Sequence, residues 1–585
     1  MFEPIAVVGR SCLLPGASSP EELWEAVAAG RDLLSDAPPE RWGLPRELAL
    51  TDDPAHSRDR AWSARGGYVS GFDFAAVAAQ DPFRRPAEDL LALDPLFHWV
   101  LHTGRQALRM AGHDGSPARA SVVMGNLSFP SSSMSRYAEH RWFGRPAVDP
   151  RNRFMSGLPA TLLAEDQGLV HGTALDAACA SSLIAVDHAA TALASRRVDL
   201  ALAGAVCRSD DLFIHVGFCA LDAMSRTGRS RPFHRGADGL VPAEGAAFVA
   251  LKRLDDAVAA GDRVLGVIRG VGLSNDGRGR GLLAPDASGQ VRALRSAWAS
   301  SGLDPARLSL AECHATGTPV GDATELETMR AMFGDRSDAL PIGSLKSNLG
   351  HLITTAGAAG LIKVLSAMEH GIRPPTLHVE DPSPALAKGP FRLVTEAEPW
   401  TSNEPRVATV SAFGFGGNNA HLVVEEHHTE RKLHASVAVR PEPLAVVAVA
   451  VRAPGGGTTL DFAADLAAGT SQVRADGVSV GPVTLHLEKL RFPPRDLEQT
   501  LAQQTLLLDA AMEAAEAAGA PLPKDRTAVL VGCQSDPEVC RYGARWRMRA
   551  WHAGRDEAWL RAAQDAVVPV LESPGVVGNM PNIPA

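Results

Sequence analysis

The chain has none of the features that mark membrane, secreted or nucleic-acid-binding proteins. No apolar run approaches the about 20 residues that a membrane-spanning helix needs. The first residues, Met-Phe-Glu-Pro, lack the basic start and the long apolar core of a signal peptide. The net charge of −10 over 585 residues is modest and argues against nucleic acid as a main partner. We therefore expect a cytoplasmic protein without a membrane span.

Cysteine is scarce and scattered as well. The seven cysteines form no Cys-x-x-Cys pair, so the sequence predicts neither a disulfide framework nor a zinc site, and we expect no bound metal. In a reduced cytoplasm a free thiolate can persist. A cysteine in suitable surroundings could therefore serve as a nucleophile.

Short apolar runs alternate with helical patterns through most of the chain. Residues 5–9, 120–125 and 198–206 are apolar runs of strand length, and residues 20–34 and 291–301 have helical spacing. Such alternation predicts an α/β architecture with buried sheets. At about 150 residues per domain, the length corresponds to roughly two to four domains.

An internal repeat divides the chain. Three segments of a second copy match the first: 442–447 match 3–8, 497–519 match 90–112, and 526–532 match 119–125. Residues 581–585 align with 156–160, so the second copy would stop before any counterpart of Cys179. We expect a complete domain, a linker and the N-terminal part of a second, truncated domain, at residues 1–428, 429–441 and 442–585. A domain cut in mid-sheet should expose apolar surface or depend on packing against the first domain.

Cys179 lies at the centre of a stretch that could hold a nucleophile. The run 169–175 predicts a buried strand, and Ala-Ala-Cys-Ala-Ser-Ser then leads into a helical run. Ser181 or Ser182 could cap that helix, and its positive end would stabilise a thiolate at position 179. The alternative is a structural role, because free cysteine is often buried as a small hydrophobe.

Three further segments place polar or glycine-rich turns directly after apolar strands, where α/β folds hold their sites. They are Glu-Cys-His-Ala-Thr-Gly-Thr at 312–318, Lys-Ser-Asn-Leu-Gly-His at 346–351, and Phe-Gly-Phe-Gly-Gly at 413–417. A lone histidine in such a turn is usually structural. His314 in one strand-end turn, together with Lys346 and His351 in another, indicates a catalytic site.

With Asp-Ala-Ala-Cys-Ala-Ser-Ser at 176–182, these motifs resemble those of the β-ketoacyl synthases of fatty acid and polyketide assembly, over residues 4–426. The resemblance implies the thiolase fold, in which two similar α/β halves pack as αβαβα layers, usually in a dimer. Ala315, Asn418 and His234 depart from the commonest family wording, and none of them removes a catalytic group.

The resemblance also implies catalytic roles. Cys179 would carry the acyl chain as a thioester. His314 and His351 would bind the thioester carbonyl of a malonyl unit and stabilise the enolate that decarboxylation leaves. The backbone N–H groups of Cys179 and Phe415 would hold the oxyanion of the condensation step.

One further catalytic residue and four supporting residues follow from the same resemblance. Lys346, the fourth catalytic residue, would pair with Glu325 and tune the charge around the histidines, and its alternative is a purely structural buried ion pair. Thr316 and Thr318 would hydrogen-bond the phosphopantetheine arm of an acyl carrier protein, and Phe415 would gate the passage between acyl and malonyl pockets. No bound cofactor is implied, because that arm delivers the substrate. The implied partners are the acyl carrier protein and its malonyl and acyl thioesters.

The second copy makes the chain resemble one particular subfamily of these synthases. A complete synthase followed by a synthase-like copy resembles the ketosynthase and chain-length-factor pair of polyunsaturated fatty acid synthases, and Ala448 in place of Gly9 suits a non-catalytic partner. We expect either such a pair or a homodimer. The predicted reaction is a decarboxylative Claisen condensation that extends a fatty acid or polyketide chain by two carbons. Two alternatives stay open: a thiolase-type acyltransferase that acts without decarboxylation, and a non-catalytic chain-length factor or scaffold in which Cys179 is a relic.

Overall fold

The computed structural model describes residues 2–580, except 54–57, 128, 209, 278–282, 429–442, 455–456, 474, 476, 489–493, 520–521 and 524–525. The predicted linker, 429–441, and the aligned residues 581–585 lie outside the described residues. Among the helices that are described, none is long and apolar enough to cross a bilayer.

One sheet of eleven strands organises the chain up to Glu425, in the order β12-β10-β9-β14-β15-β8-β1-β7-β6-β4-β5. In chain order these strands are β1 (Ile5–Leu13), β4 (Ala118–Asn126), β5 (Leu169–Leu175), β6 (Leu200–Cys207), β7 (Gly245–Arg253), β8 (Gly266–Asn275), β9 (Leu308–Glu312), β10 (Leu340–Gly343), β12 (Phe391–Leu393), β14 (Val407–Phe413) and β15 (Asn418–Glu425). Two short pairs lie outside it, β2 (Ser35–Asp36) with β3 (Arg65–Gly66) and β11 (Ile372–Arg373) with β13 (Glu398–Pro399).

The sheet consists of two similar halves. In the order β5-β4-β6-β7-β1, the first two ladders are parallel and the next two are antiparallel. The order β10-β9-β14-β15-β8 repeats that pattern. The halves meet where β1 pairs antiparallel with β8, with Ile5 opposite Ile268. The predicted pair of α/β halves is therefore confirmed.

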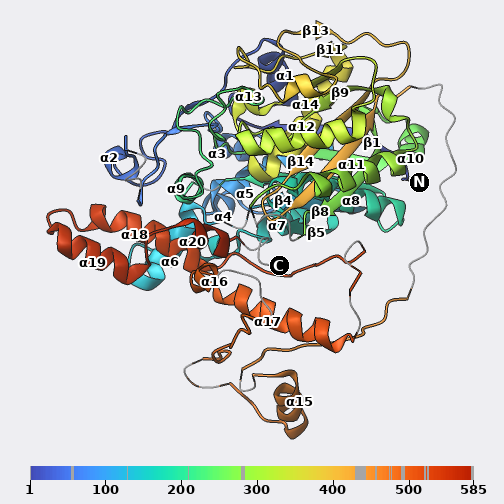
Figure 1. Ribbon diagram of the computed structural model, residues 1–585. Coiled ribbons are helices and arrows are strands. Elements are labelled where there is room, and N and C mark those ends of the chain that lie inside the picture. The colour runs from blue at the N-terminus through green and yellow to red at the C-terminus, as the bar shows by residue number, and fades with distance from the viewer. Residues whose placement is uncertain are drawn as a thin grey trace.

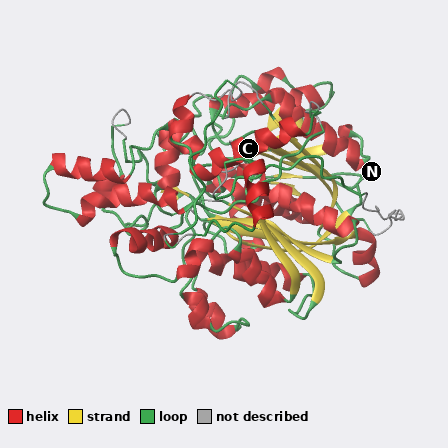
Figure 2. Cartoon of the chain, turned by 90° about the horizontal axis from the view of Figure 1, so that it is seen from below, coloured by secondary structure: helices red, strands yellow, loops and turns green. Residues whose placement is uncertain are grey.

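Helices cover both faces of the sheet, and Figure 2 shows them in red on either side of the yellow strands. The main helices of this part of the chain are α1 (Pro20–Ala28), α5 (Pro95–Met110), α6 (Ser132–Phe143), α7 (Leu158–Gln167), α8 (Ser181–Ala194), α9 (Phe213–Ala220), α10 (Leu254–Ala260), α11 (Ala287–Ser301), α12 (Pro319–Phe333) and α14 (Ala356–His370). Shorter ones are α2 (Arg46–Ala49), α3 (Phe74–Gln80), α4 (Ala87–Leu91) and α13 (Lys346–Leu349).

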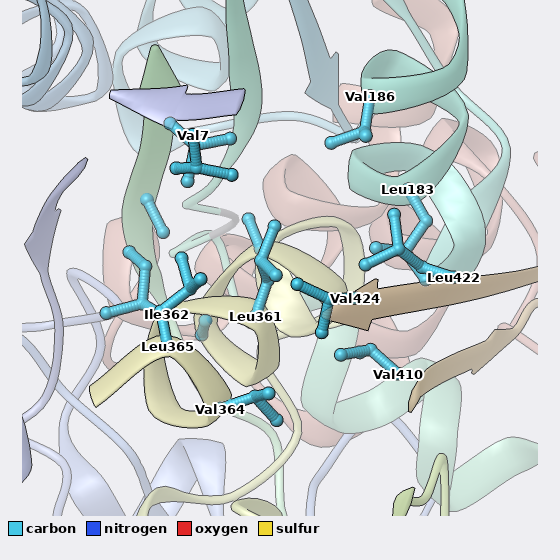
Figure 3. Packing of buried hydrophobic residues seen from close by; sticks show 14 of the residues in the cluster. Val7, Leu183, Val186, Leu361, Ile362, Val364, Leu365, Val410, Leu422 and Val424 are labelled. Carbon is cyan, nitrogen blue, oxygen red and sulfur yellow. The ribbon is translucent and has the colours of Figure 1, made fainter. Parts of the chain in front are cut away.

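The layers follow from which side chains share a core. Helices α8 and α14 lie between the two halves of the sheet, and Figure 3 shows Leu183 and Leu361 from these helices packed with Val7 and Val424 from the two halves. Because strand side chains alternate between faces, Ala6 instead joins the outer core with α5 and α7. On the other outer face, α11 and α12 cover the second half of the sheet. These are the αβαβα layers of the thiolase fold.

The described residues after 442 add no strand to the sheet. They form α15 (Thr459–Ala468), α16 (Pro494–Glu498), α17 (Ala502–Ala517), α18 (Cys540–Trp551), α19 (Glu557–Val567) and α20 (Ser573–Gly578). In Figure 1, α15 and α17 lie away from the sheet, whereas α18 and α20 lie beside α6. We call residues 535–580 the C-terminal arm.

The arm packs on the first domain through both apolar and charged contacts. Tyr542, Trp546 and Val576 share a buried core with Phe213 and with Cys179. Arg545 donates to both carboxylate oxygens of Asp59 at 2.8 Å. The backbone N–H of Ser535 donates to the hydroxyl of Ser156 at 2.8 Å. The second copy therefore depends in part on packing against the first domain.

Candidate active site

Cys179 lies in a tight turn between β5 and α8. A single turn of 3₁₀ helix, Ala178–Ala180, carries it, and Ala178 has a left-handed φ of 50°. The hydroxyl of Ser181 accepts the N–H of Ala177 at 2.9 Å and donates to the carbonyl of Ala178 at 2.7 Å. Ser181 therefore braces the turn and does not cap α8, whose N-cap residue is Ala180. The predicted cap is wrong because the serine bonds backward into the strained turn.

The second serine ties the nucleophile's helix to its counterpart. The hydroxyl of Ser182 accepts the backbone N–H of Ala358 on α14 at 3.0 Å. Gly357 lies so close to Leu183 that a Cβ there would be 2.6 Å from the leucine Cγ. The small residues after His351 are thus needed for α8 and α14 to approach each other.

The structure brings together three of the four predicted catalytic side chains, those of Cys179, His314 and His351. The Sγ atom of Cys179 lies 3.0 Å from Nε2 of His351. The rings of His314 and His351 have centroids 5.4 Å apart and are nearly perpendicular, at 82°. One ligand-type atom from each of Cys179, His314 and His351 lies within 4.8 Å of the others. A thioester carbonyl that reaches the sulfur would therefore also reach both imidazoles.

Burial controls the protonation of these groups. Only 5% of Cys179 is exposed, and burial raises the pKa of its thiol to about 12, although nearby Lys346 and the backbone N–H of Phe415 act to lower it. The expectation of a thiolate at neutral pH is wrong for the free protein, because desolvation outweighs the helix end. The resting pair is a neutral thiol beside a neutral imidazole, since burial and Lys346 hold the pKa of His351 well below 6.5.

His314 is neutral for the same reasons. Burial, then Lys346 and His351, hold its pKa well below 6.5. A neutral imidazole has one N–H and one lone pair, so it can donate a hydrogen bond without charge. The two rings are therefore suited to donate to a developing negative oxygen.

Lys346 begins the short helix α13, directly after β10, and is 6% exposed. Burial lowers its pKa, whereas Glu312, Glu325 and Cys179 act to raise it. The predicted partner, Glu325, accepts the backbone N–H groups of His314 and Ala315 at 2.7 Å each. No salt bridge between Lys346 and Glu325 is among the contacts of the described residues, so Glu325 mainly fixes the His314 turn.

Two buried acids that sequence reasoning missed hold the surrounding backbone. Glu312 accepts the ammonium of Lys363 at 2.6 Å and the N–H of Leu345 at 2.7 Å, and so links β9 to the start of α13. Asp322 accepts three backbone N–H groups, from Phe233, Thr316 and Gly317 at 2.7, 3.1 and 3.2 Å. The signal in the sequence was a carboxylate within a buried strand or helix next to a catalytic turn.

The remaining predicted residues lie around the same site. The hydroxyls of Thr316 and Thr318 are 3.0 Å apart in the turn that Asp322 holds. Phe415 lies between β14 and β15, followed by Gly416 and Gly417, which have left-handed φ values of 84° and 79°. Its ring is 6.2 Å from the ring of Phe218 on α9. Six of the eight predicted site residues thus lie in turns around the site, whereas Glu325 lies on helix α12 and Lys346 begins helix α13.

A thiolase fold with a buried Cys-His-His site and two matching half-sheets defines the condensing enzymes as a class. The chain belongs to the beta-ketoacyl synthase family. It matches the family's N-terminal domain over residues 2–257 and its C-terminal domain over residues 265–380. A match to the ketoacyl-synthetase C-terminal extension covers residues 381–463, and so runs across the predicted linker into the second copy.

Known proteins agree with this assignment. The chain is 36% identical over 441 residues to the pikromycin polyketide synthase component PikAIII of Streptomyces venezuelae, which covers 72% of this chain and 28% of that protein. It is 36% identical over 434 residues to the phenolphthiocerol synthesis polyketide synthase Pks15/1 of Mycobacterium bovis, covering 72% of this chain and 20% of that protein. The chain thus spans between a fifth and a third of these two relatives.

Solved structures extend the comparison to the second copy. A structure described as PfaC keto synthase-chain length factor superposes with a TM-score of 0.89 at 29% identity, and covers 100% of this chain and 69% of that one. The oxazolomycin ketosynthase domain of Streptomyces albus gives a TM-score of 0.66 at 32% identity, and covers 74% of this chain and 76% of that one.

Proposed function

We propose that the chain catalyses the decarboxylative condensation of an acyl group on Cys179 with a malonyl unit on an acyl carrier protein. The observation that carries the proposal is the contact of 3.0 Å between Cys179 Sγ and His351 Nε2, with His314 beside both. Family membership and the polyketide synthase relatives support it.

The first half-reaction loads the chain. The Cys179 sulfur attacks the carbonyl of an acyl-carrier thioester as its proton passes to Nε2 of His351, because burial keeps the free thiol neutral. The backbone N–H groups of Cys179 and Phe415 hold the oxyanion. The carrier sulfur leaves and takes the proton from His351, so the acyl group exchanges one thioester for another.

The second half-reaction breaks a carbon–carbon bond and forms another. The malonyl thioester carbonyl accepts hydrogen bonds from His314 and from the Nε2–H tautomer of His351. Loss of CO₂ leaves its electron pair in an enolate whose oxygen these donors stabilise. The enolate carbon attacks the acyl-Cys179 carbonyl, the Cys179 sulfur leaves as a thiolate, and it regains a proton from solvent. The product is a β-ketoacyl chain two carbons longer.

The carrier protein is the partner that this scheme requires. Thr316 and Thr318, with hydroxyls 3.0 Å apart on one turn, are suited to hydrogen-bond the amides of a phosphopantetheine arm. The protein itself then needs no bound cofactor, and the arm belongs to the substrate. A cytoplasmic location is part of the proposal, and the seven free thiols favour a reducing compartment.

We further propose that the second copy acts as a synthase-like partner joined in cis, as in a ketosynthase and chain-length-factor pair of the polyunsaturated fatty acid type. Helices α6 and α18 occupy matching places in the two copies, with Arg136-Tyr137 in one and Arg541-Tyr542 in the other. They pack on each other, and Ser135 interacts with Cys540, the residue before each Arg-Tyr pair. Contact between equivalent residues is what a two-fold axis produces.

The test is intact-protein mass spectrometry after incubation with labelled acyl- and malonyl-carrier proteins, with released CO₂ measured in parallel. We expect a covalent acyl group on Cys179, release of CO₂ and a β-ketoacyl product. Condensation of acetyl-CoA with the malonyl carrier left intact would instead establish the thiolase alternative. Thiolases use a second cysteine, and Cys313, next to His314 in sequence, contacts Met329 in the core at 3.6 Å. Absence of both loading and decarboxylation would leave the scaffold alternative.

A further inference from the structure

We infer that Arg547, on the arm, is a positioning residue for the acyl side of the active site, and that it acts through helix α9. This inference rests on the proposed function. It starts from α9, which is a wall of the site: Phe213 and Phe218 share a core with Cys179, and Phe218 faces the Phe415 ring at 6.2 Å. Residues Phe213 to Cys219 of the helix are all buried.

The N-terminus of helix α9 lacks a side-chain cap. Its N-cap residue, Leu212, has a left-handed φ of 62° and makes no side-chain cap. A bulky residue in this conformation persists only when its surroundings hold it. The preceding residue, Asp211, is 1% exposed and provides that hold, because its carboxylate is fixed from outside the helix.

Asp211 is bound by the arm. Its carboxylate accepts the guanidinium of Arg547, together with the hydroxyl of Ser135 at 2.5 Å. Arg547 also donates through Nε to Glu139 on α6 at 2.6 Å. All three charged side chains are buried, so each depends on the others to offset its desolvation.

The shape of α18 is adapted to this contact. One turn before Arg547, on the same face, Gly543 lies so close that a Cβ there would overlap the Asp211 carboxylate. Further along α9, a Cβ on Gly217 would meet Val576 of α20 at 3.7 Å, in ordinary van der Waals contact. The arm thus holds α9 at its start through a charge cluster and in its middle through apolar packing, opposite Cys179.

Loss of the Arg547 contact should change acyl loading of Cys179 but not malonyl decarboxylation. Malonyl decarboxylation uses His314 and His351, which lie on turns after β9 and β10, and no contact between them and the arm is among those of the described residues. Acyl loading needs space beside Cys179, Phe415 and α9. Release of the α9 start should therefore enlarge or loosen the acyl side and leave the malonyl side intact.

The experiment compares loading of Cys179 with a short and a long acyl-carrier thioester in the full chain. In R547M, we expect the rate ratio of long to short chains to rise by about tenfold or more, since small displacements of a site wall have effects of that size. Decarboxylation of malonyl carrier, measured in a Cys179→Ala background, should stay within about twofold. R549M is the matched control, because Arg549 lies on the same helix but pairs with Glu557 inside the arm, at 2.6 Å.

The E139Q/D211N/R547M triple variant guards against misfolding, because it removes the cation together with both buried carboxylates that the cation neutralises. We expect it to melt close to the wild type and to retain the altered chain-length ratio. An unchanged ratio in both variants, or an equal fall in loading and decarboxylation, would overturn the role of Arg547. If the wild type does not load acyl groups, the proposed function itself fails, which is a different outcome from an unchanged ratio.

Discussion

Two helices of the first copy recur in the described part of the second copy, whereas its strands do not. Helix α17 occupies the positions that match α5, and both are 16 residues long; α15 likewise matches the position of α1. Among the described residues of the second copy, the strands do not recur. Residues 5–8 lie in β1 of the central sheet, whereas the matching residues 444–447 have no regular secondary structure and are exposed.

The difference has a simple physical cause. A helix satisfies its backbone hydrogen bonds within its own segment, whereas a strand needs neighbours. In the first copy, β1 pairs with β7 and β8, and β4 pairs with β5 and β6. All four partner strands come after residue 168, beyond the part of the first copy that the second one repeats. Similar sequence therefore gives buried strands in one copy and exposed apolar segments in the other.

The largest expected effect tests whether the nucleophile is Cys179 of the first copy and not a cysteine of the second copy. Cys179→Ala should abolish acyl loading and lower condensation by at least about 10³-fold, because it removes the nucleophile. Decarboxylation of malonyl carrier should continue, since His314 and His351 remain. Cys533→Ala, which changes the exposed thiol of the second copy, is the control and should load like the wild type. Intact-protein mass spectrometry and CO₂ release check both variants, and acyl loading in Cys179→Ala would locate the nucleophile elsewhere.

The second-largest expected effect tests whether His314 stabilises the enolate formed by malonyl decarboxylation. His314→Ala should slow malonyl decarboxylation by roughly 10²- to 10³-fold, as expected for loss of one donor to a developing oxyanion. Acyl loading should fall less, because the Cys179–His351 contact is intact. Because burial holds the pKa values of His314 and His351 well below 6.5, these rings stay neutral as the pH falls from 7 to 6. A loss of decarboxylation that follows a titration near pH 6.5 would contradict neutral donors.

Much of this site was predictable because its residues follow strands that read clearly as apolar runs. The predicted turns do hold Cys179, His314, His351 and Phe415, and Lys346 begins the short helix α13 within its predicted segment. The fold class follows from alternating strands and helices, and the family resemblance supplied the pairing of the halves. Motif order was therefore more informative than any single residue.

What the sequence did not predict depends on burial or on distant contacts. The raised pKa of Cys179 results from desolvation that only the packed site creates. Glu312 and Asp322 work through backbone N–H groups, which no residue pattern records. The arm's Arg547 meets Asp211 across 336 positions of sequence, so no local signal could relate them.

A buried acid of the first copy provides a pH test. Burial raises the pKa of Glu325 to about 7 from 4.5, so the folded protein binds a proton there that the unfolded chain releases. Its contribution to stability is therefore present at low pH and declines as the pH rises from about 4.5 to about 7. Relative to Glu325→Gln, the wild type should lose about 3 kcal/mol of unfolding free energy between pH 4.5 and 8. Denaturant unfolding at several pH values measures this, and a difference that stays constant or grows with pH would contradict a raised pKa.

The smallest expected effect is on stability. It compares matched valines in strand β1 and in the corresponding segment of the second copy. Val7 in β1 is 0% exposed, and its counterpart Val446 is 84% exposed. Val7→Ala should destabilise the protein by about 2 kcal/mol, because it leaves a cavity between the sheet and α14. Val446→Ala should change stability by no more than about 0.5 kcal/mol, because its side chain already faces solvent. Equal losses in denaturant unfolding would show that residues 444–447 are buried in solution, and that the second copy finds a partner for its strands.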